Sequence, residues 1–182
     1  MICLQEVDRV SDYYEMMFNA LGYKLVHYGR PGLLRGEGVA IAYNFDKIRL
    51  VEKEEIDFDK ISNLYPSGGV FRRANQAIIC LFQLKTNGLK FVGASTHLHF
   101  NPQFDFVKHA QALYLMEKAA SFLKLHDQDL PIFIGGDFNS TPVSSVMSVF
   151  HSEDIDPPTS VVDCPSRWRI PLVAQTGVKE YY

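Results

Sequence analysis

Polar side chains of a catalytic type follow three short apolar runs of this sequence. They are a carboxylate, an imidazole and an Asp/Asn pair: Glu6 after residues 2–4, His97 after residues 91–94, and Asp137 with Asn139 after residues 132–134. Short apolar runs bounded by polar residues and glycine are consistent with buried strands. If these strands end on one edge of a packed sandwich, the polar groups converge there. Loops held by a rigid scaffold are where catalytic groups usually sit.

Such a set of side chains suits hydrolysis of a phosphoester. A carboxylate can hold a hard divalent cation that supplies Lewis acidity, and Mg²⁺ typically takes only one or two protein carboxylates. An aspartate can orient or deprotonate the attacking water, and a histidine can stabilise the charge that develops on the phosphoryl oxygens. A structural alternative exists for each residue. Asp137 and Asn139 can form a simple Asx turn, and His97 can be a hydrogen-bonded structural residue.

A central hairpin and one long helix dominate the elements that must position these residues. Strands are expected over 77–84 and 89–95, because the intervening Asn87-Gly88 is the strongest short signal for a hairpin turn. Helical spacing of apolar residues predicts a helix over 106–125. Shorter elements are expected as follows: a helix over 14–21, strands over 23–28 and 38–43, a short edge strand within 46–60, and a helix over 143–150 capped by Thr141. Strands that alternate with helices around an antiparallel hairpin favour an α+β sandwich with helices outside.

The composition is that of a globular domain and excludes several classes. The chain has 182 residues, of which 47% are hydrophobic and 21% charged, so disordered, collagen-like and coiled-coil compositions are excluded. The net charge of −3 excludes a broadly basic nucleic-acid surface, although a local basic patch is compatible with it. No apolar run approaches the roughly 18 residues of a membrane span, so no membrane partner is expected.

Cysteine usage predicts a reducing compartment. The three cysteines, Cys3, Cys80 and Cys164, are widely spaced and odd in number, and the first two lie in apolar runs where free thiols behave as small hydrophobes. The sequence opens without a basic leader. We therefore expect a cytoplasmic protein, with mitochondrial or nuclear destinations only if a leader lies upstream of Met1.

Taken in order, the three clusters resemble signatures of the endonuclease/exonuclease/phosphatase superfamily. The closer likeness is to its RNA-directed branch, which holds the catabolite-repressor-type deadenylases, nocturnin, the Angel proteins and the 2′,5′-phosphodiesterases. The residues that carry it are Leu4-Gln5-Glu6-Val7-Asp8, Ser95-Thr96-His97-Leu98 and residues 136–142, with finer cues at residues 36–43, Asn101-Pro102, Lys108 and Gln111. The resemblance runs from residue 1 to about 150. It implies a four-layer α/β sandwich in which two packed mixed β-sheets are flanked by helices.

The resemblance also implies a role for each residue of the clusters. Glu6 would be the ligand of a Mg²⁺ ion, or of Mn²⁺ in its place. His97 would contact the scissile phosphate and its transition state, and Asp137 would orient or activate the attacking group. Asn139 would position phosphate or a water on the metal. Asn75, which precedes a strand, loosely matches a phosphate-contacting asparagine of some relatives.

Three more residues are candidates for substrate binding. Arg72 and Arg73 offer a local cation for an RNA backbone. Phe100 can stack on a base, because aromatic faces do so with little sequence preference. The alternatives are a solvated surface pair for the two arginines, and ordinary packing for Phe100 and its neighbour His99.

Two elements that the resemblance implies are not visible in the sequence. Relatives begin with a strand whose Asn helps to hold the metal, and they close with a Ser-Asp-His-type motif; the sequence contains no Asp-His pair. We therefore expect residues 1–182 to form a single partial domain, incomplete at both termini. Because catalytic groups act as a unit, we expect such a chain to be nearly inactive and poorly stable on its own.

Three functions remain open at this point. The first is a Mg²⁺-dependent phosphodiesterase that resembles 3′–5′ exoribonucleases and poly(A) deadenylases and acts on an RNA 3′ end. The second keeps the fold but changes the substrate to 2′,5′-oligoadenylate, a nucleotide or a terminal RNA phosphate. The third is a catalytically inactive fragment or interaction module. The sequence predicts no particular protein partner.

Overall fold

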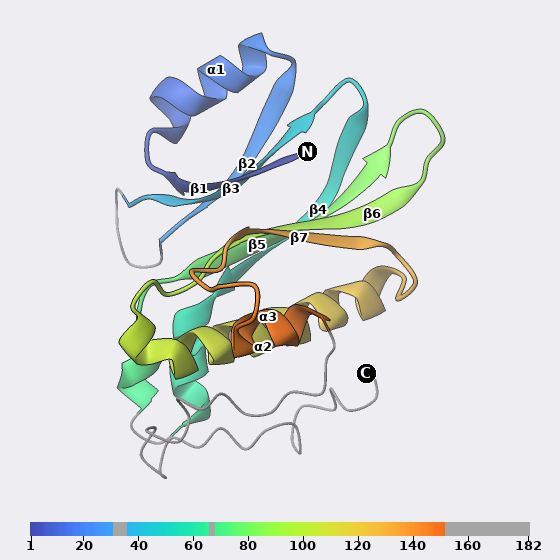
Figure 1. The fold of residues 1–182 in the computed structure, drawn as a ribbon. Coiled ribbons are helices and arrows are strands. Elements are labelled where there is room, and N and C mark those ends of the chain that lie inside the picture. The colour runs from blue at the N-terminus through green and yellow to red at the C-terminus, as the bar shows by residue number, and fades with distance from the viewer. Residues whose placement is uncertain (31–35, 66–67, 152–182) are drawn as a thin grey trace.

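The computed structural model describes residues 1–30, 36–65 and 68–151, and within them two β-sheets pack face to face. Sheet A holds three antiparallel strands in the order β1 (Ile2–Val7), β3 (Gly38–Asn44) and β2 (Tyr23–Gly29). A π-helical turn at Val10–Tyr14 leads into helix α1 (Glu15–Ala20), which lies on the outer side of this sheet (Figure 1).

Sheet B supplies two of the three polar clusters. Its four strands follow the order β4 (Ile48–Asp57), β5 (Gln76–Leu84), β6 (Lys90–His97) and β7 (Ile132–Asp137). The first three strands are antiparallel, whereas β6 and β7 are parallel. The short helices η2 (Phe58–Leu64) and η3 (Gly68–Phe71) separate β4 from β5, and η4 (Pro102–Phe104) leads into α2 (Asp105–His126); α3 (Ser145–His151) follows β7.

The layers α1, sheet A, sheet B, and α2 with α3 stack in that order (Figure 1). This confirms the predicted four-layer sandwich, although among the described strands only sheet B is mixed. Strand β5 reads as a continuous apolar run because both of its faces are buried. Ile78 and Phe82 pack between the sheets, whereas Ile79 and Leu81 pack under α2.

The predicted elements exist, but some of their limits differ. Helix α2 and the central hairpin lie where the sequence places them, and α1 is shorter than predicted. The edge strand β4 has ten residues instead of a short stretch, since charged side chains can continue along a strand that has solvent beside it. The predicted cap at Thr141 is wrong: α3 begins at Ser145, and the hydroxyl of Ser144 accepts the Met147 N–H at 3.3 Å.

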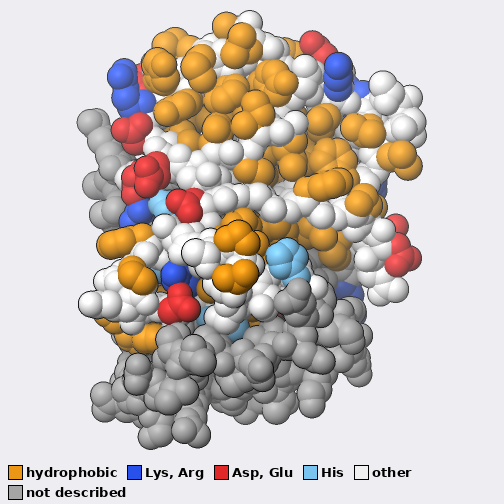
Figure 2. Space-filling view, viewed as in Figure 1, with side chains coloured by type: hydrophobic (Ala, Val, Ile, Leu, Met, Phe, Trp, Pro, Cys, Tyr) orange, Lys and Arg blue, Asp and Glu red, His pale blue; other side chains and the backbone are white. Residues whose placement is uncertain are grey.

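Apolar side chains also reach the surface. Figure 2 shows hydrophobic side chains gathered over the upper part of one face, where Figure 1 places α1 and β1; exposed members of these elements are Ile2, Met16 and Met17. No helix among the described residues is both long and apolar enough to cross a bilayer. Cys80 is buried and Cys3 half-buried, both as free thiols, and Cys164 lies outside the described residues.

Candidate active site

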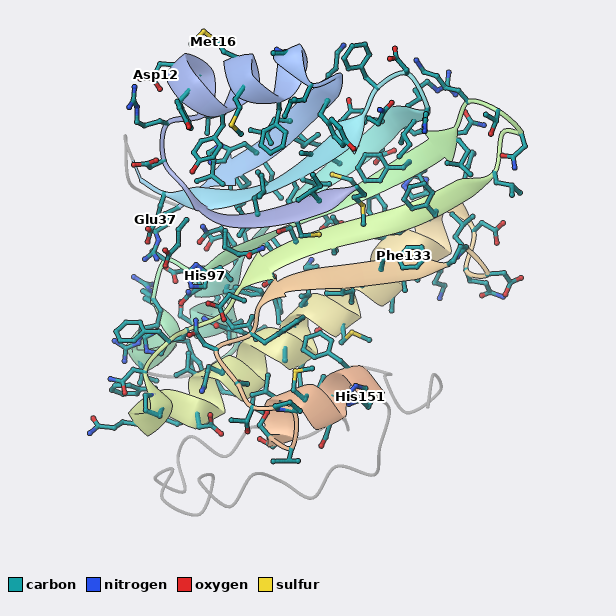
Figure 3. The ribbon with its side chains drawn as sticks, turned by 45° about the horizontal axis from the view of Figure 1, so that its top comes forward. Asp12, Met16, Glu37, His97, Phe133 and His151 are labelled. Atoms are coloured by element: carbon teal, nitrogen blue, oxygen red, sulfur yellow. The ribbon has the colours of Figure 1, made fainter. Side chains whose placement is uncertain are left out.

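The strands that carry the three clusters end at the same side of the sandwich. His97 and Asp137 are the last residues of the parallel strands β6 and β7 and face each other in register. Strand β1 of the other sheet lies beside β6, because the Gln5 Nε2 donates to the Ser95 Oγ at 3.2 Å and that hydroxyl donates to the Leu4 carbonyl at 3.3 Å. The predicted convergence of Glu6, His97 and Asp137 on one edge is therefore present, and Figure 3 marks the position of His97 there.

Glu6 lies in an irregular part of β1. The pairing of β1 with β3 shifts between Leu4 and Val7, and Glu6 within this bulge has a φ of 57°. Its side chain is exposed. Bulges re-aim side chains and are frequent next to active sites. The bulge thus presents a carboxylate at the strand end, where a cation could bind it.

His97 and Asp137 form the closest pair of candidate catalytic side chains. The His97 Nε2 lies 4.0 Å from the Asp137 Oδ2, which is too long for a hydrogen bond. The imidazole is buried, with 8% of its side chain exposed, whereas 52% of the carboxylate side chain is exposed. A buried imidazole beside an accessible carboxylate leaves both groups able to bind a third molecule between them.

The loop after β7 is fixed by its own hydrogen bonds. The Asn139 N–H donates to the Asp137 Oδ1 at 2.8 Å, which is the Asx turn that the sequence left open. The Asn139 Nδ2 donates to the Leu98 carbonyl at 2.9 Å, and the Leu98 N–H donates to the Asp137 carbonyl at the same distance. The turn and a catalytic role are compatible, because the turn fixes one carboxylate oxygen and leaves Oδ2 facing His97.

Backbone strain in the described residues is concentrated at these segments. The non-glycine residues with positive φ are Glu6, Ala74 and Asn139, which lie at the end of β1, just before β5 and just after β7. Gly136 has a φ of 152°, and a Cβ there would lie 2.1 Å from the Thr96 carbonyl oxygen of the neighbouring strand. Strained residues persist where the surrounding structure holds them, and they cluster at functional sites.

Asn75 lies beside His97, with its side-chain amide bonded to protein at both ends. Its Nδ2 donates to the His97 carbonyl at 3.0 Å, and its Oδ1 accepts from the Gln111 Nε2 at 3.3 Å. The side chain is buried. The structure therefore places Asn75 next to His97, where its side chain holds the end of β6, and its contact with phosphate stays a prediction.

The three further candidates for substrate binding, Arg72, Arg73 and Phe100, contact different residues of the protein. The Arg72 Nε donates to the Ser62 Oγ at 3.2 Å, and the Arg73 guanidinium lies 4.3 Å from the centre of the Phe104 ring. Phe100 is 71% exposed, which leaves its ring available to a ligand, although it also touches the His99 ring at 5.2 Å between centroids.

Three further residues at this end were not assigned a role from the sequence. His99 is buried against Phe100 and Phe104, and burial, with repulsion from Arg73 and Lys108, lowers its pKa to about 4. Glu37 forms an ion pair with Arg30, and it directly precedes Gly38, the partner of Val7 in the pairing of β1 with β3. Lys108 is buried on α2 although a long charged side chain normally indicates a surface position.

The described donor set fits a metal that needs few protein ligands. No group of three or more His, Cys, Asp or Glu side chains within residues 1–30, 36–65 and 68–151 is arranged to hold an ion. The accessible oxygens are carboxylates, from the exposed Glu6 and the half-exposed Asp137. Mg²⁺ prefers oxygen ligands, takes one or two carboxylates and keeps several waters, so this set suits Mg²⁺ better than Zn²⁺.

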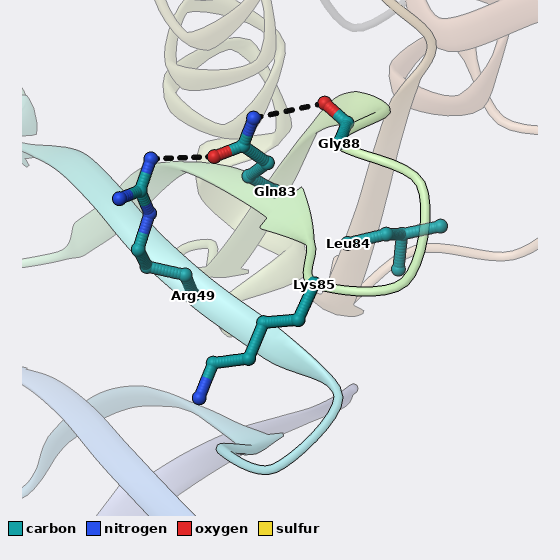
Figure 4. Close-up of a pocket in the computed structure, with 5 residues that line it drawn as sticks. All are labelled: Arg49, Gln83, Leu84, Lys85 and Gly88. Carbon is teal, nitrogen blue, oxygen red and sulfur yellow. Dashed lines mark hydrogen bonds between the residues drawn. The ribbon is translucent and has the colours of Figure 1, made fainter.

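A separate cavity lies at the other end of sheet B. It measures about 430 Å³ and is lined by residues of β4 and of the β5–β6 hairpin: Arg49, Gln83, Leu84, Lys85 and Gly88 (Figure 4). The Arg49 guanidinium donates to the Gln83 Oε1, and the Gln83 Nε2 donates to the Gly88 carbonyl at 2.9 Å. None of the predicted site residues lines this cavity.

Comparison with known proteins places the chain among nucleases and phosphatases. The sequence profile described as the endonuclease/exonuclease/phosphatase family matches residues 1–176. The CCR4-Not complex 3′-5′-exoribonuclease subunit Ccr4 of Yarrowia lipolytica is 29% identical over 82% of the chain, and that of Mycosarcoma maydis is 32% identical over 79%. The chain spans 27% of the length of each of these two relatives.

Solved structures give the same fold. The human nocturnin catalytic domain with bound sulfate superposes with a TM-score of 0.71 at 23% identity, over 84% of this chain and 56% of that one. ANGEL2, described as a 2′,3′-cyclic phosphatase and solved with adenosine-2′,3′-vanadate, superposes with a TM-score of 0.71 at 27% identity, over 82% of this chain and 42% of that one. These superpositions support the four-layer fold.

Proposed function

Because the chain belongs to the endonuclease/exonuclease/phosphatase family, we propose that it is a divalent-metal-dependent hydrolase of phosphodiester bonds in RNA. The observation that carries the proposal is the pair formed by His97 and Asp137, 4.0 Å apart at the ends of adjacent parallel strands, with the strand of Glu6 packed beside them. A buried imidazole and two accessible carboxylates at one edge are the groups that metal-assisted phosphoester hydrolysis uses.

Glu6 is the residue that would hold the metal, which we propose to be Mg²⁺, with Mn²⁺ as a substitute. When bound, the cation would supply charge neutralisation at the phosphoryl oxygens. The bulge exposes the Glu6 carboxylate, so a cation could bind without burying an unpaired charge.

The remaining roles follow from position and hydrogen bonding. The Asp137 Oδ2 would accept a proton from, or orient, the attacking water, while its Oδ1 is held by the Asn139 N–H. His97 would donate a hydrogen bond to a phosphoryl oxygen as negative charge develops there. Asn139 could accept a hydrogen bond from a water through its side-chain Oδ1. Its Nδ2 donates one N–H to the Leu98 carbonyl, and the second N–H could donate to the phosphate.

We propose the 3′ end of single-stranded RNA, with adenylate bases, as the substrate. The exposed Phe100 ring offers a stacking surface, and Arg73, whose backbone is held by Asp59, brings a cation to the same end of the sandwich. The two Ccr4 relatives carry the name 3′-5′-exoribonuclease, which supports this choice.

A second candidate is removal of a phosphate from an RNA end. The superposition on ANGEL2, named a 2′,3′-cyclic phosphatase, favours it. A 2′,5′-linked oligoadenylate would use the same residues with a different approach of the sugar. The third candidate, a catalytically inactive fragment or interaction module, predicts no turnover of any of these substrates.

The test compares these substrates on the purified protein. Oligoadenylates with 3′,5′ or 2′,5′ linkages and an RNA ending in a 2′,3′-cyclic phosphate are incubated with Mg²⁺, with Mn²⁺ or with EDTA. We expect Mg²⁺-dependent shortening of the 3′,5′ substrate, at the low rate expected of a partial domain. The isosteric variants Glu6→Gln and Asp137→Asn remove charge while keeping shape, and each should reduce the rate at least about 100-fold.

Two results would contradict the proposal. Turnover that survives both substitutions would show that the site lies elsewhere. RNA binding by fluorescence anisotropy with no turnover on any of the three substrates would favour the interaction module. Preference for the cyclic or 2′,5′ substrate would keep the site and move the function to the second candidate.

A further inference from the structure

The first half of helix α2 buries polar side chains where a helix packed on a sheet normally buries apolar ones. Lys108 is 4% exposed and Gln111 is fully buried, one turn apart on the same helix. Burying a charge or an amide is unfavourable unless its hydrogen bonds are made. Methionine would fill either position with nearly the same length and no such requirement. We call Lys108 and Gln111 the polar pair of α2. The groups to which they are hydrogen-bonded therefore decide what these two residues do.

Lys108 connects α2 to the loop after β7. Its Nζ donates to the Asp105 carboxylate at 2.8 Å and to the Asn139 backbone carbonyl at 2.9 Å. Asn139 is one of the strained residues, with a φ of 48°, and its N–H holds the Asp137 carboxylate. A charge-assisted hydrogen bond to the carbonyl of a strained residue stabilises that conformation. Lys108 thus acts on Asp137 through Asn139.

Gln111 connects the same helix to the other two segments of the site. Its Oε1 accepts the His99 N–H at 2.9 Å, which holds the chain just after β6. Its Nε2 donates to the Asn75 Oδ1 at 3.3 Å, and Asn75 in turn donates to the His97 carbonyl at 3.0 Å. The side-chain amide of Gln111 therefore uses both its acceptor and its donor to hold the chain at the end of β6, directly at His99 and through Asn75 at His97.

We propose that Lys108 and Gln111 are positioning residues, which hold the segments of Asn75, His97 and Asp137 in one fixed arrangement from a single rigid helix. The inference rests on the proposed function for its catalytic meaning, but the positioning itself is a statement about hydrogen bonds. Catalytic geometry tolerates errors of about 0.5 Å, and this tolerance requires supporting contacts outside the reacting groups. Two polar residues on one helix provide such contacts to all three segments.

Amide hydrogen exchange measured by NMR tests each connection separately. The Lys108→Met variant keeps the length of the side chain and removes its donor, so the Asn139 amide should exchange at least about tenfold faster. The Gln111→Met variant removes the acceptor for the His99 amide, which should accelerate by a similar factor while the Asn139 amide changes little. Amides of β3, in the other sheet, should keep their rates in both variants.

Leu115→Ala is the matched control on the same helix. Leu115 is buried in the core one turn after Gln111 but contacts apolar neighbours, so its truncation should destabilise the whole fold. Exchange through global unfolding should then rise by a common factor in β3 and at the site. If Lys108→Met fails to fold, Asp105→Asn gives a milder test, because it removes only the carboxylate that fixes the Lys108 ammonium.

Kinetics supply the functional readout. Lys108→Met and Gln111→Met should lower kcat for the RNA substrate about tenfold or more with little change in KM, and Lys108→Arg should restore part of the rate. Exchange that follows the Leu115→Ala pattern in both methionine variants would overturn the proposal, as would unchanged exchange. If the unmodified protein hydrolyses nothing, the proposed function fails, yet the exchange pattern still decides whether the polar pair orders these segments.

Discussion

The two ends of strand β6 are built in opposite ways. At the His97 end, buried polar side chains and strained residues meet: Asn75, Lys108 and Gln111 are buried, and Ala74 and Asn139 have positive φ. At the Lys90 end, a hairpin turns at exposed residues, and Gly88 takes the positive φ. The His97 end therefore has positive φ at non-glycine residues as well as at Gly136, whereas the hairpin end has it at glycine, the residue type that its turn requires.

The difference indicates where the core supports function. A residue in a sparsely populated backbone region costs of order 1–3 kcal/mol, so three such residues are retained only if packing holds them. The core between sheet B and α2 lies directly behind the His97 end and supplies that packing. The hairpin end needs no such support. Matched substitutions at the two ends therefore test whether the ends differ in function and in stability.

The largest difference between the ends should appear in catalysis. The His97→Ala variant should lose about 10³-fold in kcat, because in the proposed function the imidazole would stabilise charge that appears only in the transition state. The Gln83→Ala variant, at the hairpin end of the neighbouring strand, should keep kcat within about twofold. Steady-state kinetics with a thermal melt of each variant checks this. Equal losses in both variants would mean that the contrast between the ends is not functional.

A second contrast compares two glycines with positive φ. The Gly136→Ala variant should be destabilised by about 3 kcal/mol or more, because its Cβ would lie 2.1 Å from the Thr96 carbonyl oxygen. In the Gly88→Ala variant the Cβ would have only the Gln83 side chain nearby, at 3.6 Å, so the loss should be about 1 kcal/mol. Urea unfolding measures both. A smaller loss at Gly136 than at Gly88 would show that the two strand ends are not held closely together.

The sequence predicted the strands of the site better than its supporting contacts. Short apolar runs mark the buried strands, and these runs located Glu6, His97 and Asp137. The order of the three polar clusters along the chain was enough for a family resemblance. The register that places His97 opposite Asp137 depends on β6 pairing in parallel with β7, which no local pattern encodes. Resemblance marked Lys108 and Gln111 as cues, but polar residues on a helix normally indicate its solvent face.

The sequence misplaced the start of α3 and underestimated the length of β4, and each error has a physical reason. Thr141-Pro142 has the chemistry of a helix start, but the chain makes a turn first and Ser144 caps α3. Most charged side chains of residues 46–60 are exposed, yet pairing with β5 extends β4 well beyond the predicted short strand. Pairing with a neighbouring strand outweighed local preference in β4, whereas a local turn moved the start of α3.

The third prediction concerns the buried histidine at the His97 end. The pKa of His99 is lowered to about 4 from an ordinary value near 6.5, so between these pH values the unfolded chain binds a proton that the folded protein does not. Stability should therefore fall as the pH drops from 6.5 to 4, by at most about 3 kcal/mol. The His99→Phe variant should lose this part of the pH dependence in urea unfolding. His151→Gln, at an exposed histidine of α3, should retain it. If the unfolding free energy of the His99→Phe variant depends on pH as in the unmodified protein, groups other than His99 cause this dependence.

The smallest effects should come from two arginines, one at each end. Arg49 donates to Gln83 in a solvent-exposed hydrogen bond, and Arg72 donates to the buried Ser62 hydroxyl. Alanine should therefore cost less than about 0.5 kcal/mol at Arg49 and about 1 kcal/mol at Arg72. If Arg72 also meets the RNA backbone, its variant should raise KM a few-fold and flatten the salt dependence of binding, whereas Arg49→Ala should change neither. Equal KM values in the two variants would leave Arg72 with only its contact to Ser62. The cation for the substrate would then have to come from Arg73, whose guanidinium lies over Phe104 nearer to His99.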